Sequence, residues 1–104
     1  DRGELLAFAL MDGGTPLARQ YSIKKAYTAS RIHRDLRDFA AYRQAVGRQV
    51  IDFADPNLVG SARGGVVIRD PRSEKVLGAI GVSGGTPDED EEVARLGLAA
   101  VTLA

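Results

Sequence analysis

The stretch that decides the fold is VLGAIGVSGGTPDEDEEVA, at residues 76–94. It begins with an aliphatic run broken only by glycines, which is typical of a strand, and the Ser-Gly-Gly tripeptide at 83–85 predicts the turn that ends it. Thr86 then suits a helix N-cap, Pro87 suits the first helical position, and Glu89 completes a capping box. We therefore predict a strand, a turn and a helix in succession.

A glycine-rich turn that opens a helix can cradle a phosphate, because the free amides of a helix start attract anions. Here residues 88–92 are five consecutive carboxylates, which the helix dipole favours but which would repel a phosphate. The chain also lacks the lysine–hydroxyl pair of a P-loop and the full glycine pattern of a dinucleotide site. These features disfavour a nucleotide site at this turn.

The composition indicates one domain, residues 1–104, and limits the chemistry that it can carry. Fourteen basic and fourteen acidic residues cancel, so no overall field draws the chain to nucleic acid or to an anionic membrane. No apolar run is long enough to span a bilayer. The lack of cysteine excludes disulfides and thiolate sites, and a single histidine excludes a zinc site built on several imidazoles. A chain without cysteine is typical of the cytoplasm, where we expect this protein.

Hydrophobic spacing and turn residues predict the remaining elements. The first are a strand at 4–11, a turn at 12–16 and a helix that Ser22 caps and that runs to about 36. A helical piece at 38–46 either continues this helix or follows a break. An irregular segment at 47–63 leads to strands at 65–69 and 75–82, which are joined as a hairpin. This order differs from the regular alternation of a Rossmann sheet. We predict an α+β fold in which helices cover an antiparallel sheet.

The chain begins DRGELLAFALMDGG, without an initiator methionine, and enters a strand almost at once. Residues 1–3 resemble the tight turn of a hairpin whose first strand is absent. We therefore expect an upstream helix and strand that are either processed off or outside this sequence. A signal peptide could have been lost with them.

Five separated blocks carry a resemblance to a known family. They read MDG at 11–13, IKKAYTA at 23–29, GGVVI at 64–68, GAIGVSG at 78–84 and DEEVA at 90–94. In this order the blocks resemble the bacterial GlcG/HbpS-like family (DUF336), a family of haem-binding or haem-degrading domains that includes PduO C-terminal-like domains. The resemblance implies a profilin/PAS-like two-layer sandwich, a homo-oligomer, one further helix and strand before residue 1, and a haem cofactor or a corrinoid-related role.

The helical block of this family resemblance supplies three candidate pocket residues. Lys25 could pair with a haem propionate, while Tyr27 and Thr28 could donate hydrogen bonds to a ligand. The alternative is structural, with Lys25 as a solvated surface charge and Thr28 bonded within its own helix. We favour the pocket.

His33 is the one imidazole and therefore a candidate axial ligand for haem iron. The alternative, which the residues favour, is a partly exposed helix residue between Ile32 and Arg34. Met11 and Tyr27 are weaker candidates for ligation, because both suit core positions.

Glycines gather in the predicted strands and turns, and Gly64, Gly65, Gly81 and Gly84 could line a cleft where the backbone approaches a flat ligand or a second subunit. Ordinary turn and bulge chemistry is the alternative for at least half of them. Ser83 would belong to the same cleft. It is not a candidate nucleophile, because no triad surrounds it.

The acidic helix start could hold a metal ion. Asp88 with Glu91, and Glu89 with Glu92, are spaced three apart, so each pair could share one hard cation on an exposed helix face. The favoured alternative is a solvated first turn that the helix dipole stabilises.

Three functions from different classes remain open. We favour an oligomeric protein that binds haem or a related tetrapyrrole, in haem or redox handling or in a catabolic operon. The second is an enzyme acting on a small carboxylate or carbonyl compound, with Lys25, Tyr27 and Ser83 around its pocket, although no base with an obviously tuned pKa is visible. The third is an accessory or assembly subunit without a ligand, associating through strand edges.

Overall fold

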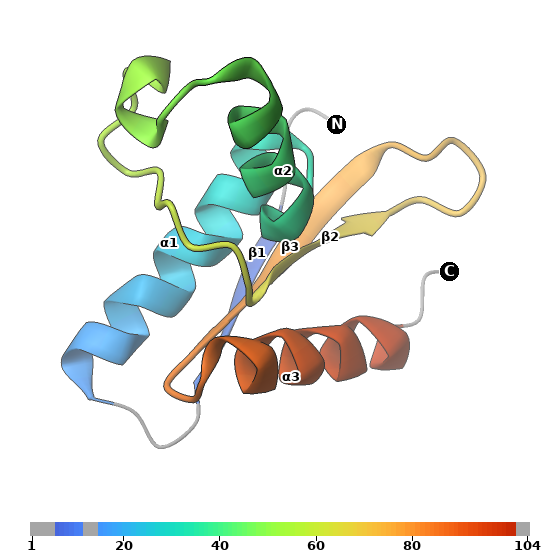
Figure 1. Ribbon diagram of the computed structural model, residues 1–104. Helices are drawn as coiled ribbons and strands as arrows, with labels where there is room; N and C mark the ends of the chain where they lie inside the picture. The colour runs from blue at the N-terminus through green and yellow to red at the C-terminus, as the bar shows by residue number, and fades with distance from the viewer. Residues whose placement is uncertain (1–5, 12–14, 102–104) are drawn as a thin grey trace.

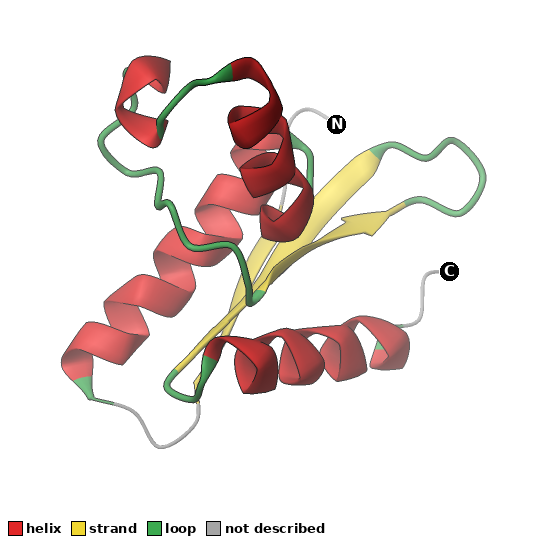
Figure 2. Cartoon of the chain, in the orientation of Figure 1, coloured by secondary structure: helices red, strands yellow, loops and turns green. Residues whose placement is uncertain are grey.

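A computed structural model describes residues 6–11 and 15–101, with side chains from residue 15 onward. Its elements are β1 (Leu6–Met11), α1 (Pro16–Ile32), α2 (Leu36–Val46), the short 3₁₀ helix η1 (Val50–Phe53), β2 (Gly65–Arg69), β3 (Val76–Ser83) and α3 (Pro87–Ala100) (Figures 1 and 2). The α+β class is confirmed. The segment at 47–63, predicted as irregular, contains η1 as its one regular element within the described residues. Among the same residues, no helix has the length and apolar character needed to cross a membrane.

The sheet has the strand order β1–β3–β2, with β3 in the centre. The predicted hairpin is confirmed, because β2 pairs antiparallel with β3. The prediction of a wholly antiparallel sheet is wrong, since β1 lies parallel to β3, with Phe8 opposite Ile80. Between β1 and β3 the chain passes through α1, α2 and β2, and the hairpin after β2 reverses its direction, so that β3 runs the same way as β1.

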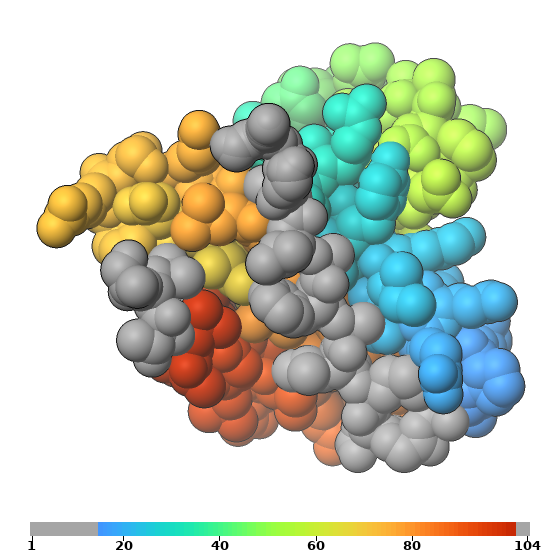
Figure 3. All heavy atoms as spheres, turned by 180° about the vertical axis from the view of Figure 1, so that it is seen from behind, coloured from blue at the N-terminus to red at the C-terminus, as the bar shows by residue number. Residues whose placement is uncertain are grey.

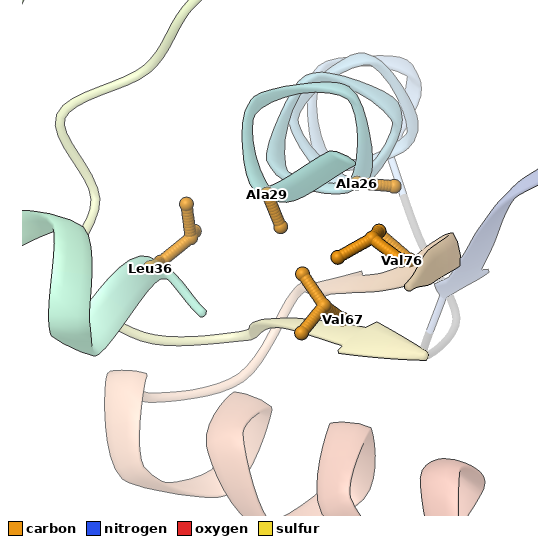
Figure 4. Close-up of a cluster of buried hydrophobic side chains, with 6 residues drawn as sticks. Ala26, Ala29, Leu36, Val67 and Val76 are labelled. Atoms are coloured by element: carbon orange, nitrogen blue, oxygen red, sulfur yellow. The ribbon is translucent and has the colours of Figure 1, made fainter. Parts of the chain in front are cut away.

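Helices cover both faces of the sheet, so the expected two-layer sandwich is corrected to three layers. On one face Val67 and Ala79 belong to one cluster with Ala26 of α1. Figure 4 shows Val67 and Ala26 in this cluster. On the other face Val66 and Ile80, one position along each strand, belong to the cluster under α3. Alternate residues of a strand point to opposite faces, which explains the continuous apolar runs of β2 and β3. Seen from behind, α1 and α3 form opposite flanks of the molecule (Figure 3).

Two glycines let α1 and the start of α2 lie directly on the sheet. A Cβ at Gly81 would meet the carbonyl oxygen of Ser22 and would lie 2.6 Å from the amide nitrogen of Ala26. A Cβ at Gly65 would lie 2.6 Å from Cγ of Leu36. The neighbour that approaches these two strand positions is therefore a helix of the same chain.

The first helix differs from its prediction at both ends. It begins at Pro16, because the Thr15 hydroxyl caps it by accepting a hydrogen bond from the Ala18 amide at 3.1 Å. Ser22 is not an N-cap, and its hydroxyl bonds back to the Arg19 carbonyl at 2.9 Å. The helix ends at Ile32, and the cap residue His33 has a left-handed φ of 64°, so α1 and α2 are separate.

The start of α3 agrees with its prediction in every cap contact. The Thr86 hydroxyl accepts from the Glu89 amide at 3.2 Å, and the Glu89 carboxylate accepts from the Thr86 amide at 2.9 Å. Pro87 occupies the first turn. The capping box and the proline fix where this helix begins.

Candidate functional site

Lys25 is buried and joins three elements. Its ammonium group donates to the Val82 carbonyl at 2.8 Å and lies 3.2 Å from a carboxylate oxygen of Asp90. Only 3% of Lys25 and 5% of Asp90 is exposed. The second oxygen of Asp90 accepts from the Gly85 amide at 3.0 Å. The alternative of a solvated surface lysine is therefore wrong, and a carboxylate ligand at Lys25 would have to displace Asp90.

The glycines beside this ion pair make room for it. Gly64 has a φ of 89°, and a Cβ there would lie 2.9 Å from the Lys25 ammonium nitrogen. Ser83 is buried next to the Val82 carbonyl, whereas Gly84 is exposed with a φ of 120°. Close packing accounts for Gly64, Gly65 and Gly81. Their contact with a ligand stays a prediction.

Thr28 is fully buried and holds the segment that follows η1. Its hydroxyl donates to the Lys24 carbonyl at 2.7 Å, as the alternative of bonding within the helix expected. It also accepts from the Val59 amide at 3.0 Å. Thr28 thus fastens residues 54–59 to the side of α1.

Tyr27 lies on the outer side of α1 and bonds to the same segment. Its hydroxyl donates to Asp55 at 2.7 Å, and Arg31 lies 3.7 Å from the same carboxylate oxygen. The hydrogen bond to Asp55 raises the pKa of Tyr27. The same bond, followed by the bond from the Asn57 amide, lowers the pKa of Asp55. The pair is therefore a neutral phenol donating to a carboxylate.

Each residue of this bonded pair lines a hollow of its own. One, of about 430 Å³, is lined by Gln20, Ile23, Lys24, Tyr27 and Asn57. The other, of about 590 Å³, is lined by Val50, Ile51, Ala54, Asp55, Pro56 and Leu58. We call the two hollows together with the Tyr27–Asp55 pair the Tyr27 face. Lys24 and Arg31 belong to the same helical stripe as Tyr27, three residues before it and four after it.

His33 does not belong to the Tyr27 face. It follows Tyr27 by six positions, which corresponds to about 9 Å along α1 and about 120° around it. The residue is exposed, and its carbonyl accepts from Arg69 at 3.0 Å. Its role as an iron ligand stays a prediction, and so does that of Met11, whose side chain is outside the described residues.

The acidic residues at the start of α3 have separate partners. Glu89 caps the helix, Asp88 lies 3.5 Å from Arg63, and Glu91 accepts from the Gly64 amide at 2.9 Å. Within residues 15–101 no group of three or more histidine or acidic side chains is placed to hold a metal ion. A cation shared by Asp88 with Glu91, or by Glu89 with Glu92, stays a prediction.

A network that the sequence did not reveal covers the free edge of β2. Asp35 accepts from the Val67 amide at 2.8 Å, Glu91 accepts from the Gly64 amide, and Arg95 bridges the two carboxylates at 2.8 and 2.9 Å. Burial alone would lower the pKa of Arg95, but its bonds to Asp35 and Glu91 outweigh burial and raise it. The four-residue spacing of Glu91 and Arg95 on a helix indicates an ion pair between them. Nothing in the sequence indicates the contact of Arg95 with Asp35, because the two residues are far apart in the chain.

Comparisons with known proteins agree with this fold. A structure of the Klebsiella pneumoniae protein ORFY, assigned to DUF336, superposes with a TM-score of 0.68 at 24% identity and covers 88% of this chain. The chain spans 65% of that structure's length. No curated protein matches the sequence. The family described as "Haem degrading protein HbpS-like" matches residues 1–99, and the chain belongs to this HbpS-like family.

Proposed function

We propose that this domain binds haem or a related tetrapyrrole on the Tyr27 face, as one subunit of a homo-oligomer. Membership of a family described as haem-degrading supports the ligand class. The observation that carries the location is the pair of hollows, one lined by Tyr27 and the other by its hydrogen-bond partner Asp55. Such hollows, apolar with a few polar groups, are typical of small-ligand sites.

The residues of the Tyr27 face fit the two halves of a haem. Ile23 and the aliphatic residues of the larger hollow offer apolar surface for the macrocycle. Lys24 and Arg31 are cations on one stripe of α1, and each could pair with one propionate. Lys24 thus takes the role that the sequence suggested for Lys25, because Lys25 is held in the core.

Few of the described residues that line the two hollows can ligate haem iron. Haem iron in proteins is held by histidine, cysteine, methionine or tyrosine. Tyr27 is the one such side chain among the described residues that line the two hollows, and its raised pKa disfavours the phenolate that iron would need. We therefore assign Tyr27 a hydrogen-bonding role. Bound haem would supply a redox-active iron, and the chain would supply the cations and the apolar walls.

A hemin titration followed at the Soret band tests this function. We expect saturable binding near one hemin per chain, with affinity reduced roughly fivefold by Lys24→Ala or Arg31→Ala, since a partly exposed ion pair is worth about 1 kcal/mol. Lys75→Ala, an exposed lysine on the hairpin between β2 and β3, is the matched control and should bind like the wild type. Absence of a saturable spectral change would contradict the proposal.

The geometry does not support the enzyme hypothesis, because that hypothesis requires Lys25, Tyr27 and Ser83 to line one pocket. Lys25 points into the core and Tyr27 toward Asp55, because positions two apart on a helix differ by about 160°.

The homo-oligomer has one specific observation in its favour. Leu17 and Tyr21 on α1, and Val93 and Leu96 on α3, are large apolar residues that are exposed in the single chain. Apolar surface of this kind is common where subunits meet. Light scattering at micromolar concentration should show more than one chain per particle, and a monomer would contradict this part of the proposal.

A further inference from the structure

A third hollow lies away from the Tyr27 face, at the edge of β2. It has a volume of about 400 Å³, and its lining residues come from the start of α2, from β2 and from the last turns of α3. Figure 1 shows where these three elements lie in the fold. Its lining is Arg34, Asp35, Asp38, Val67, Arg69 and Leu98. No residue is shared with the lining of the two hollows of the Tyr27 face. We call it the β2-edge pocket.

Both guanidinium groups of the pocket are held in place by other parts of the chain. Arg34 lies over the ring of Tyr42 at 4.5 Å. Arg69 donates to the carbonyls of His33 and Glu74, each at 3.0 Å. Arginine has five N–H donors, so Arg69 keeps three for a ligand. Fixed guanidiniums lose little entropy on binding and suit a carboxylate.

The two carboxylates of the pocket are not equivalent. Both oxygens of Asp35 already have partners, because one lies 2.8 Å from Arg95 and the other accepts from the Val67 amide. Asp38 is exposed and forms no ion pair within the part of the chain that the structure describes. The charged side chains of the lining that have no ion-pair partner among the described residues are therefore those of Arg34, Arg69 and Asp38.

Leu98, which is half-buried on α3, supplies the aliphatic part of the lining. Val67 also borders the pocket from β2, but its side chain packs under α1. A ligand that fits must carry an anionic group, a cationic group and a short apolar part, all within a small volume. A simple anion would face Asp38, and a simple cation would face both arginines.

We propose that the β2-edge pocket binds a free aliphatic α-amino acid. Its carboxylate contacts Arg34 and Arg69, and its ammonium group contacts Asp38. Its side chain lies over Leu98. This site is independent of haem binding, so either site can exist without the other.

Three probes of nearly the same size test the proposal by titration into ¹⁵N-labelled protein. L-Leucine carries both charges, 4-methylpentanoate lacks the ammonium group and 3-methylbutylamine lacks the carboxylate. We titrate each to about 20 mM, because weak sites of this kind bind at millimolar concentration. Leucine should shift the amides of residues 34–38 and 67–69. It should also bind roughly fivefold more tightly than either single-charge probe.

Two variants assign the charges. Arg34→Gln should weaken leucine and 4-methylpentanoate, whereas Asp38→Asn should weaken leucine and leave 4-methylpentanoate unchanged or tighter. Arg37→Gln and Glu92→Gln change exposed residues outside the pocket and should bind leucine like the wild type. Unchanged thermal midpoints of the variants exclude misfolding as the cause.

The proposal is overturned if leucine shifts no amide around the pocket. It is equally overturned if the three probes bind alike, or if both pocket variants bind leucine as the wild type does. Hemin binding is unaffected by any of these outcomes, so the two sites are judged separately.

Discussion

Lys25 and Asp90 form a buried ion pair whose members depend on each other. Replacing Lys25 by methionine keeps the volume but leaves the Asp90 carboxylate buried without its cation. Breaking one side of a buried pair costs about 3–5 kcal/mol, so the free energy of unfolding should fall by that amount. Urea unfolding measures it.

The neighbouring lysine supplies the control for this prediction. Lys24 is half-buried and outside the core, so Lys24→Met should change stability by no more than about 0.5 kcal/mol. The double variant Lys25→Met/Asp90→Asn should be more stable than Lys25→Met alone, since it removes the stranded charge. If Lys25→Met and Lys24→Met are equally stable, the Lys25–Asp90 pair is not buried as described.

The Tyr27–Asp55 bond predicts a pH dependence. Because the bond lowers the pKa of Asp55, its contribution is present above pH about 4 and is lost as pH falls through the lowered folded pKa. Because it raises the pKa of Tyr27, the contribution is also lost above pH about 10. Tyr27→Phe should therefore melt below the wild type at pH 7 and approach it at about pH 2. A difference in midpoint that does not vary with pH would contradict the bond.

At the scale of elements, the contact between α1 and β3 depends on one small residue. Gly81→Ala places a methyl group against the Ser22 carbonyl and the Ala26 amide, both of which are backbone atoms. The helix must move away, at a cost of about 1–3 kcal/mol. Gly60→Ala is the matched control, because its Cβ would lie 3.4 Å from a flexible Val50 methyl group. Thermal unfolding compares the two, and equal midpoints would mean that α1 does not lie on Gly81.

The edge of β2 depends on Arg95. Arg95→Gln removes the cation that Asp35 and Glu91 share, so both carboxylates should release the edge amides of Val67 and Gly64 more readily. An uncovered edge strand pairs with other chains, so we expect faster hydrogen exchange at Val67 and more aggregation on heating. Arg37→Gln should change neither. Unaltered exchange at Val67 in Arg95→Gln would contradict the role of the network.

Elements whose ends depend on local contacts were predictable from the sequence. Thr86, Pro87 and Glu89 specify the start of α3 by contacts within four residues, and the structure has all of them. The predicted start of α1 at Ser22 is wrong, because Ser22 is as good an N-cap residue as Thr15. Only the proline that follows Thr15 distinguishes the two. The parallel pairing of β1 with β3 was not predictable from the sequence, since it joins segments about seventy residues apart.

The same difference between local and distant contacts separates the residues of the candidate site. The sequence identified Tyr27, and the structure gives it a hollow and a partner. It could not indicate that the adjacent Lys25 points into the core, because Asp90 lies sixty-five positions away. A one-residue difference along a helix decides whether a lysine lies in the core, as Lys25 does, or outside it, as Lys24 does.

At the scale of the whole molecule, the sheet and its two helical layers place the Tyr27 face and the β2-edge pocket at separate locations. The layers are fixed by the alternating residues of β2 and β3, and α1 presents one side to the sheet and the opposite side to residues 54–59. The central claim is that a tetrapyrrole binds on that outer side.

One measurement tests this claim most directly, namely the amide shift map of ¹⁵N-labelled protein on addition of gallium protoporphyrin, a diamagnetic analogue of hemin. We expect saturable shifts that cluster at residues 20–27 and 54–58, with the hairpin at 70–75 unchanged. Shifts that cluster around His33 or around Ser83 and Gly84, or no saturable shifts at all, would contradict the claim.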